Sequence, residues 1–394
     1  MSALAGASLL FACHALYIQQ RQIASGYGDF VIYYTGAQIV RDGAASDLYD
    51  LGRQRQYQAQ YATAIRAGAL PFNHPAYELL WHIPLTFLSY VNAYIIWNVI
   101  NAGLLLGLGR WFAPRERPDL RWLFTIMAFG FYPVLVVFLH GQDSILLTCL
   151  IGGSMLALKR KKQVVAGVLL ALGAFKPQIV LPIALSWVYR PYRKAALMFL
   201  ISGILLGLLS IAMVGISGTV KYLELLSWID KTRYTISPSL MPNLRGLIYS
   251  LLGAQYPSVV LPTTVAVTIG VLVLIVRIWH GVPSDNENVF DLTVALTLTL
   301  TLLTTYHAYA HDFTLLLLPA LIATRAMLVG TPNSLVPSLL LVVLLVLWIP
   351  FPLTYGRLVE AEKLAWGALA IIVFAALLAL QLKVSHGQHL TRLH

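Results

Sequence analysis

Charged side chains are scarce in this sequence, and that scarcity decides the class of protein. Asp, Glu, Lys and Arg make up 11% of the 394 residues, whereas 58% are hydrophobic. Water-soluble domains carry roughly a quarter charged residues, because their surfaces face water. A soluble chain of this length has no way to cover so much apolar surface, so we expect an all-α polytopic membrane protein.

Cysteine is also scarce, and the motifs of several enzyme classes are missing. Cys13 and Cys149 are the only cysteines and lie in apolar stretches, which excludes a disulfide framework and a Cys-rich metal site. The chain has no Gly-rich phosphate loop, no His-Glu-x-x-His and no Gly-x-Ser-x-Gly. These absences disfavour nucleotide-driven chemistry and zinc hydrolysis, and no cofactor is expected.

Long apolar runs, by contrast, recur along the whole chain. A helix that crosses a bilayer needs about 20 mostly apolar residues. We assign ten full spans, at residues 2–17, 90–109, 122–139, 144–158, 195–215, 258–276, 289–306, 313–328, 335–351 and 364–382. A further apolar stretch, residues 164–189, is interrupted by Lys176-Pro177 and leaves two pieces too short to cross alone. We expect two half-helices with Lys176 at their turn, inside the membrane.

The basic residues predict the orientation of the spans. The net charge is +11, and residues 159–162, Arg190, Arg193 and Lys194 lie in short connections between apolar stretches. Cytoplasmic loops of membrane proteins carry such an excess of Lys and Arg. We therefore expect an integral plasma (inner) membrane protein with both termini in the cytoplasm. Binding of nucleic acid is disfavoured, because these bases sit between spans rather than on one continuous surface.

Two external loops are too long to be simple connectors. In the first, residues 18–89, a helix is expected to begin near Asp29 and stop near Gly43. Asp50 is the expected N-cap of a second helix over residues 51–66, lying along the membrane surface. The loop must therefore fold.

The second external loop, residues 216–257, and the segment 306–312 place further polar side chains on the same side of the membrane. An external site has no access to cytoplasmic nucleotide sugars. A group transfer there would draw on an activated donor already in the membrane, and a lipid-linked sugar is the obvious candidate.

Short motifs follow one another in a fixed placement relative to the spans. They are Asp29-Phe30-x-x-Tyr33-Tyr34, Leu48-Tyr49-Asp50, His74-Pro75, Pro84-Leu85, Gly141-Gln142, Ala166-Gly167, Lys176-Pro177, Asn243-x-x-Gly246 and His311-Asp312. In these motifs the chain resembles the GT-C superfamily of polytopic glycosyltransferases, most closely glycosyltransferase family 87. The resemblance covers most of the chain. Two positions depart from the family pattern: His74-Pro75 stands where a double proline is usual, and Ser144 where an asparagine is frequent.

The resemblance implies a GT-C-like bundle of about ten full transmembrane helices, a broken half-helix pair and a folded first external loop, in one domain over residues 1–394. It also implies an enzyme that moves a hexose, commonly mannose, from a polyprenyl-phosphate donor to a lipid or glycan acceptor with inversion. Asp29 would be the general base, which takes the proton of the acceptor hydroxyl. The candidates for binding the donor phosphate are Lys176, His311 and Arg245, and those for binding substrate are Tyr33, His74, Gln142 and Asn243.

Each role has a structural alternative. Asp29 would also serve as the N-cap of its helix, and Lys176 would snorkel to an interface. Asp143 and Asp312 are expected to be N-caps of the spans that follow them. Because Asp29 has no second acid within four residues, we expect metal independence. The alternative function is a lipid-linked sugar transporter or flippase, since broken helices and cations inside the membrane also occur in transporters.

Overall fold

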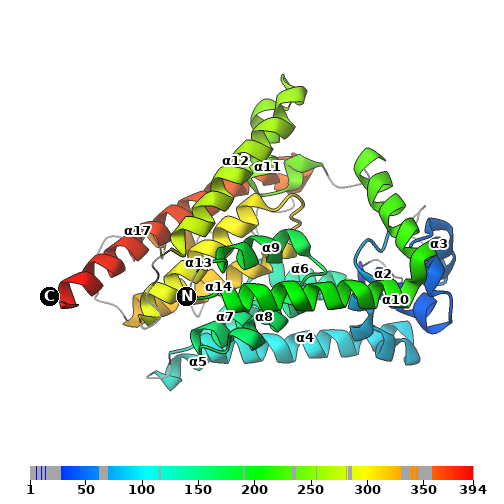
Figure 1. Ribbon diagram of the computed structural model, residues 1–394, viewed down its shortest axis with the longest axis horizontal. Helices are drawn as coiled ribbons and strands as arrows, with labels where there is room; N and C mark the ends of the chain where they lie inside the picture. Colours follow the sequence, from blue (N-terminus) through cyan, green and yellow to red (C-terminus); the bar gives the residue numbers. More distant parts are fainter. Residues whose placement is uncertain are drawn as a thin grey trace.

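The computed structural model is all-helical over the residues that it describes. It describes residues 28–394 apart from 62–69, 115–116, 190, 233–236, 254, 281, 283–285, 330–337, 341, 345–356 and 394, and only Gly6, Leu10 and His14 before residue 28. The longer helices pack lengthwise, and α2 and α3 lie together at one end of the molecule (Figure 1).

Short 3-10 turns lie between several of the helices along the chain. In chain order, the elements that position the site are α2 (Phe30–Arg41), α3 (Leu51–Gln58), η2 (Ala76–Trp81), η3 (Ile83–Phe87), α4 (Tyr90–Phe112), α5 (Arg121–Phe129), α6 (Tyr132–His140), α7 (Ser144–Lys159), α8 (Gln163–Leu172), α9 (Pro177–Ser186), α10 (Arg193–Thr232), α11 (Leu244–Leu252), α12 (Pro257–Ile278), α13 (Glu287–Thr304), η6 (Asp312–Leu316), α14 (Leu317–Val329), η7 (Leu364–Gly367) and α17 (Ala368–Leu393).

The expected ten spans are not confirmed. Five described helices are long and apolar enough to cross a membrane, or six if the bent pair α5 and α6 counts as one crossing. The expected span 122–139 breaks between those two helices with a bend of 58°. Gly130 follows the end of α5, and Pro133, which has no N–H to donate, stands in the first turn of α6.

Other expected spans are shorter than predicted or fall outside the described residues. α7 has 16 residues, and residues 313–328 divide into η6 and α14. Most residues of the expected spans 2–17 and 335–351 lie outside the part of the chain that the structure describes. The helices that do meet the length criterion include α10 and α12, and outward leucines of α10, such as Leu200 and Leu205, are more than half exposed. Such apolar exposure is what a membrane-facing surface requires.

The first loop contains two helices near the expected positions. α2 begins after Asp29 and ends before Gly43, whose φ of +80° is in the left-handed region that glycine adopts most readily. Asp50 caps α3 by accepting a hydrogen bond from the Arg53 backbone N–H at 2.7 Å. The expected end of this helix at Arg66 is wrong, because α3 ends at Gln58. The Gln58 side chain makes two hydrogen bonds to the Leu70 backbone and so holds the returning chain beside α3.

α10 continues beyond the expected end of its span. Gly215 interrupts the helix with a φ of +71°, and the segment after it lies beside the first loop (Figure 1). There the Lys221 ammonium lies 2.6 Å from Asp47, and the Tyr222 ring packs on Tyr49. The start of the second loop is therefore helical and contacts the first loop.

The stretch 164–189 consists of two short helices, α8 and α9, which meet at Lys176. Lys176 directly precedes Pro177, and its side chain is only 5% exposed. Both helices contact α10, and α8 also contacts α7. Lys176 therefore lies inside the bundle, and its ammonium does not reach a surface.

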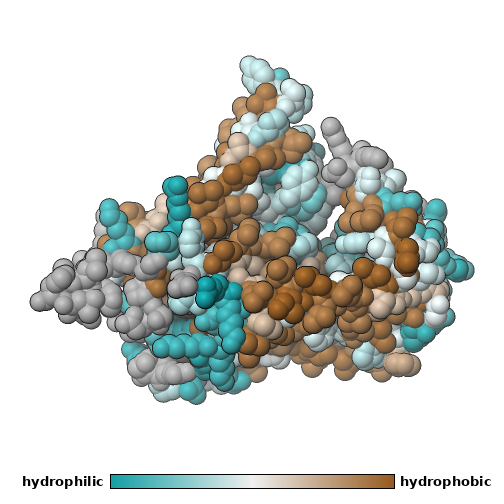
Figure 2. Space-filling view, viewed as in Figure 1, coloured by the Kyte–Doolittle hydropathy of each residue, from teal (hydrophilic) through white to brown (hydrophobic). Residues whose placement is uncertain are grey.

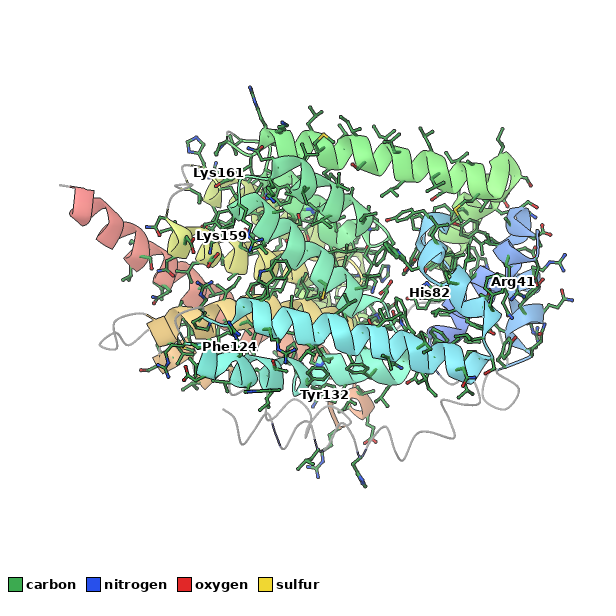
Figure 3. The ribbon with its side chains drawn as sticks, turned by 90° about the horizontal axis from the view of Figure 1, so that it is seen from below. Arg41, His82, Phe124, Tyr132, Lys159 and Lys161 are labelled. Atoms are coloured by element: carbon green, nitrogen blue, oxygen red, sulfur yellow. The ribbon has the colours of Figure 1, made fainter. Side chains whose placement is uncertain are left out.

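The surface is divided between apolar and polar zones. A broad hydrophobic band crosses the visible face, and hydrophilic residues gather at its lower left and at the right-hand rim (Figure 2). Lys159 and Lys161 lie at one end of the molecule and Arg41 at the other (Figure 3). The basic connection after α7 and the folded first loop are thus at opposite ends, as the two sides of a membrane would require.

Candidate active site

The start of α2 lies directly against the turn between α6 and α7, and two glycines allow this approach. A Cβ on Gly28 would come within 2.9 Å of the His140 carbonyl oxygen, and a Cβ on Gly141 within 2.6 Å of the Phe30 Cβ. Gly141 also has a φ of +64°, which a residue with a side chain rarely adopts. These two positions set Asp29 beside the residues that follow α6.

The Asp29 carboxylate faces this turn and does not cap its own helix. Asp29 occupies the N-cap position of α2 without any side-chain capping hydrogen bond. Its Oδ2 accepts a hydrogen bond from Gln142 Nε2 at 2.8 Å and lies 3.2 Å from His140 Nδ1. The side chain remains 21% exposed. Asp29 therefore does not act as a side-chain N-cap, and its carboxylate is accessible to a small polar group.

The surroundings of Asp29 keep its carboxylate ionised. Burial on its own would raise the pKa, but the hydrogen bond and charge of His140, the charge of His311 and the hydrogen bond from Gln142 together lower the pKa below its usual value. Asp29 is therefore able to accept a proton across the physiological pH range. Its basicity is correspondingly modest, so its position matters more than its strength.

Tyr33 and Gln142 connect Asp29 to an aromatic group. The Tyr33 hydroxyl donates to Gln142 Oε1 at 2.8 Å, which fixes the amide so that Nε2 points to Asp29. The Tyr33 ring stacks on His82 with 5.0 Å between centroids, and His82 packs in turn on Trp97. Both Tyr33 and Gln142 are less than a tenth exposed. In this structure they therefore orient the Asp29 carboxylate from its buried side.

Lys176 is held among oxygen atoms from three segments. Its Nζ lies 2.8 Å from Asp143 Oδ1, 2.8 Å from Asp312 Oδ1 and 3.1 Å from Ser144 Oγ. An ammonium has three N–H donors, and these contacts engage all of them. Asp143 and Asp312 were expected to be helix caps, but Asp143 makes no side-chain capping bond. Its carboxylate instead pairs with Lys176, because a buried cation outweighs a local cap in energy.

His74, Glu78 and Asp143 form a second group beside Lys176. His74 Nδ1 is 2.6 Å from Glu78 Oε2 and 3.8 Å from Asp143 Oδ2. Burial lowers the pKa of His74 to about 4, so the imidazole is neutral near pH 7. Burial and the neighbouring charge of Asp143 raise the pKa of Glu78 well above its usual value. Burial would also raise the pKa of Asp143, but the charge of Lys176 and the hydrogen bond with Glu78 together keep that pKa below its usual value. Glu78 is therefore the carboxyl group that holds a proton.

The remaining candidates are His311, Arg245 and Asn243. His311 Nε2 is 3.6 Å from Asp312 Oδ1. Arg245 donates to the Tyr306 carbonyl at 3.0 Å, and its guanidinium lies over the Tyr306 ring. Asn243 accepts from Gly246 N–H and donates to the Thr305 carbonyl, so its amide caps α11 and ties that helix to the end of α13. The binding roles of these three residues remain predictions.

Sequence reasoning missed His140 and Glu78 as members of the site, and it gave Asp143 the role of a helix cap instead of a partner of Lys176. His140 directly precedes the Gly141-Gln142 motif and Asp143 directly follows it, so their position in the chain was a usable signal. Glu78 lies four residues after His74 and in η2, which begins just after His74-Pro75, so a contact between the two was within local reach. The ion pair between Asp143 and Lys176 joins residues far apart in the sequence, and no local pattern indicates it.

Comparison with known proteins identifies the family of this chain. The sequence profile described as glycosyltransferase family 87 matches residues 72–305, which is more than half of the chain. The chain belongs to glycosyltransferase family 87. Its membership makes it a glycosyltransferase that uses a sugar donor and an acceptor. The matched segment contains Gln142, Asp143 and Lys176, whereas Asp29 and His311 lie outside it. No curated protein and no solved structure matches the chain.

Proposed function

We propose that this membrane glycosyltransferase moves a hexose from a polyprenyl-phosphate donor to an acceptor hydroxyl on the external face, with Asp29 as the general base. The observation that carries the proposal is the Asp29 carboxylate, which is ionised, partly exposed and free of the capping role that its position suggests. Mannose as the sugar rests on the resemblance to family 87, and the acceptor is a lipid or a glycan.

The proposed transfer is a single displacement. The acceptor oxygen attacks the anomeric carbon while its proton passes to an Asp29 oxygen, and the bond from the anomeric carbon to the donor phosphate breaks. The polyprenyl phosphate leaves with the bonding electron pair, so the configuration at the anomeric carbon inverts. His140 and Gln142 hold the carboxylate in place during the attack.

The phosphate that leaves carries negative charge and needs donors nearby. His311 and Arg245 are the proposed donors, since both lie close to the polar segment that precedes η6. Lys176 binds phosphate only if one of its contacts with Asp143, Asp312 or Ser144 opens. In the closed arrangement its role is to hold those two carboxylates together.

The test is a transfer assay on purified protein in liposomes that contain native lipid extract. Radiolabelled polyprenyl-phosphate mannose is supplied on the outer face, and both lipid products and movement of the donor across the membrane are measured. The proposal predicts a labelled glycolipid of inverted configuration. Movement of donor between leaflets without any product would support the transporter or flippase alternative and contradict the proposal.

The proposed orientation places both termini in the cytoplasm and the first loop outside. It is supported by Lys159 and Lys161 lying at the opposite end from Arg41 (Figure 3). Single cysteines placed by Q60C and K161C, both at exposed positions, provide the test in intact cells. A membrane-impermeant maleimide should label Q60C and leave K161C unlabelled, and the reverse pattern would contradict the orientation.

A further inference from the structure

The group formed by His74, Glu78 and Asp143 has no assigned role in the proposed transfer. Glu78 and Asp143 are each 1% exposed, and they come from different segments, η2 and the turn before α7. Within the described part of the chain, Glu78 Oε1 and Asp143 Oδ2 receive no hydrogen bond. Buried polar atoms are nearly always paired. Glu78 meets His74 through its other oxygen, and it bonds to Asp143 only with a proton between the two carboxyl groups. Either that proton or a cation must therefore lie between these two acids.

Lys176 does not supply all the charge that this region needs. Its ammonium contacts Asp143 and Asp312, and with Glu78 three buried carboxylates face one ammonium. An unpaired buried carboxylate is costly in a surrounding of low dielectric constant. Without a cation the raised pKa of Glu78 keeps this group protonated. With Glu78 ionised the cluster carries two excess negative charges, which a single divalent cation would balance.

The ligand atoms are arranged as a cation site requires. One nitrogen of His74 and one oxygen each of Glu78 and Asp143 all lie within 4.8 Å of one another. His74 Nδ1 lies 2.6 Å from Glu78 Oε2 and 3.8 Å from Asp143 Oδ2. Ligand atoms that each lie roughly 2.1 Å from one ion are about 3 Å from one another, which is between these two distances. Only small side-chain shifts would be needed.

Neighbouring contacts hold two of these ligands in position. The His74 ring stacks against Phe175 at an angle of 22°, and its Nδ1 faces the two carboxylates. Asp143 keeps its Oδ1 on Lys176 while Oδ2 faces the group. Supporting contacts of this kind orient metal ligands in proteins.

We propose that His74, Glu78 and Asp143 bind one divalent cation of the Mn²⁺ or Zn²⁺ class. An imidazole beside two carboxylates suits these ions, whereas Mg²⁺ and Ca²⁺ favour sites made of oxygen alone. Three protein ligands leave at least one coordination position for water or another oxygen ligand. The proposal replaces the prediction of metal independence, which considered only acids adjacent to Asp29 in sequence. It does not rest on the proposed transfer reaction.

The experiment measures metal binding without donor or acceptor. Full-length protein, purified without a polyhistidine tag and stripped with a chelator, is titrated with MnCl₂, ZnCl₂ and MgCl₂. Bound Mn²⁺ is followed by electron paramagnetic resonance and Zn²⁺ by elemental analysis. We expect about one ion of Mn²⁺ or Zn²⁺ per chain and much weaker binding of Mg²⁺.

Variants identify the site. E78Q should weaken binding by more than the roughly 10- to 100-fold that loss of a supporting contact costs. D47N is the matched control, because Asp47 is an acid of the same loop that pairs with Lys221 and Arg53 at the surface. If E78Q does not fold, H74Q decides, since the imidazole is 20% exposed and its loss leaves both carboxylates in place. Absence of Mn²⁺ and Zn²⁺ binding by the wild-type protein, or unchanged affinity in the folded variant, would overturn the proposal.

Discussion

The two ends of α7 hold two ion clusters that differ in their balance of charge. At its end, Lys159 lies 2.9 Å from Asp291 and 3.0 Å from Glu287, and Arg325 stands near Asp291, so two bases meet two acids. At its start, Lys176 alone faces Asp143, Asp312 and the adjacent Glu78. The 16 residues of α7 separate the clusters by about 24 Å.

The clusters also differ in their access to water. In the Lys159 cluster the exposed fraction is 17% for Lys159, 21% for Asp291 and 72% for Glu287. Lys176, Asp143 and Asp312 are each 5% exposed or less. A balanced and partly exposed cluster is sufficient to join α7, α13 and α14. A buried cluster with surplus acid is costly, and such arrangements inside membranes are more often functional than structural. We therefore interpret the Lys159 cluster as structural and the Lys176 cluster, at the other end of α7, as functional.

Removal of the lysine at each end should have very different consequences. K176M leaves two buried carboxylates without a cation and should lower the free energy of unfolding by about 3–5 kcal/mol. K159M removes a pair whose side chains are 17% and 21% exposed, leaves Arg325 beside Asp291, and should cost about 1–3 kcal/mol. Thermal unfolding of the two purified variants in the same detergent checks the contrast. Equal losses of stability in K176M and K159M would show that the buried cluster contributes no more to folding than the more exposed one.

The pH dependence of transfer should reveal how far His140 lowers the pKa of Asp29. H140Q removes the charge that lowers the Asp29 pKa and leaves at most a hydrogen bond from a neutral amide, while burial continues to raise that pKa. Because a general base works only when deprotonated, the acidic limb of the kcat profile should move to higher pH. Because the wild-type Asp29 pKa lies below its usual value, the profile is measured from about pH 3 to about pH 7. The control is H280Q, which changes an exposed histidine, and an unmoved acidic limb in H140Q would contradict the assignment.

Loss of the Tyr33 hydroxyl should have the smallest effect of the three. Y33F removes the hydrogen bond that fixes the Gln142 amide, worth about 1 kcal/mol, and should lower kcat roughly fivefold. Y57F removes a hydroxyl that contacts Asp42 at the surface of the same loop and should leave kcat unchanged. A loss of similar size in both variants would mean that the connection through Gln142 does not position Asp29.

Local features of the fold could be predicted from the sequence, because their causes are local. Gly43 and Asp50 set a helix end and a helix start through backbone conformation and capping, and Lys176-Pro177 divides an apolar stretch. The count of spans could not be predicted as well. Hydropathy does not reveal that Gly130 and Pro133 bend a continuous apolar run, or that α7 is shorter than a full crossing.

The site was predictable only in part. Asp29 and Gln142 were found through the family resemblance, and the structure brings them into contact. Asp143 was expected to cap α7, because capping is the commonest role of an acid before a helix. Its actual partner, Lys176, comes from another helix, and Glu78 comes from the first loop. Long-range pairing of charges decided these roles, and a single sequence does not contain that information.

The most direct test of the account is the rate of transfer by D29N at saturating donor. Loss of the general base should lower kcat by about 10²- to 10⁴-fold. The KM for the donor should stay within about threefold of the wild-type value, because Asp29 acts in the transition state. D47N in the same loop should retain wild-type kcat. A D29N variant that transfers sugar as fast as the wild-type enzyme would contradict the assignment of Asp29 as the base.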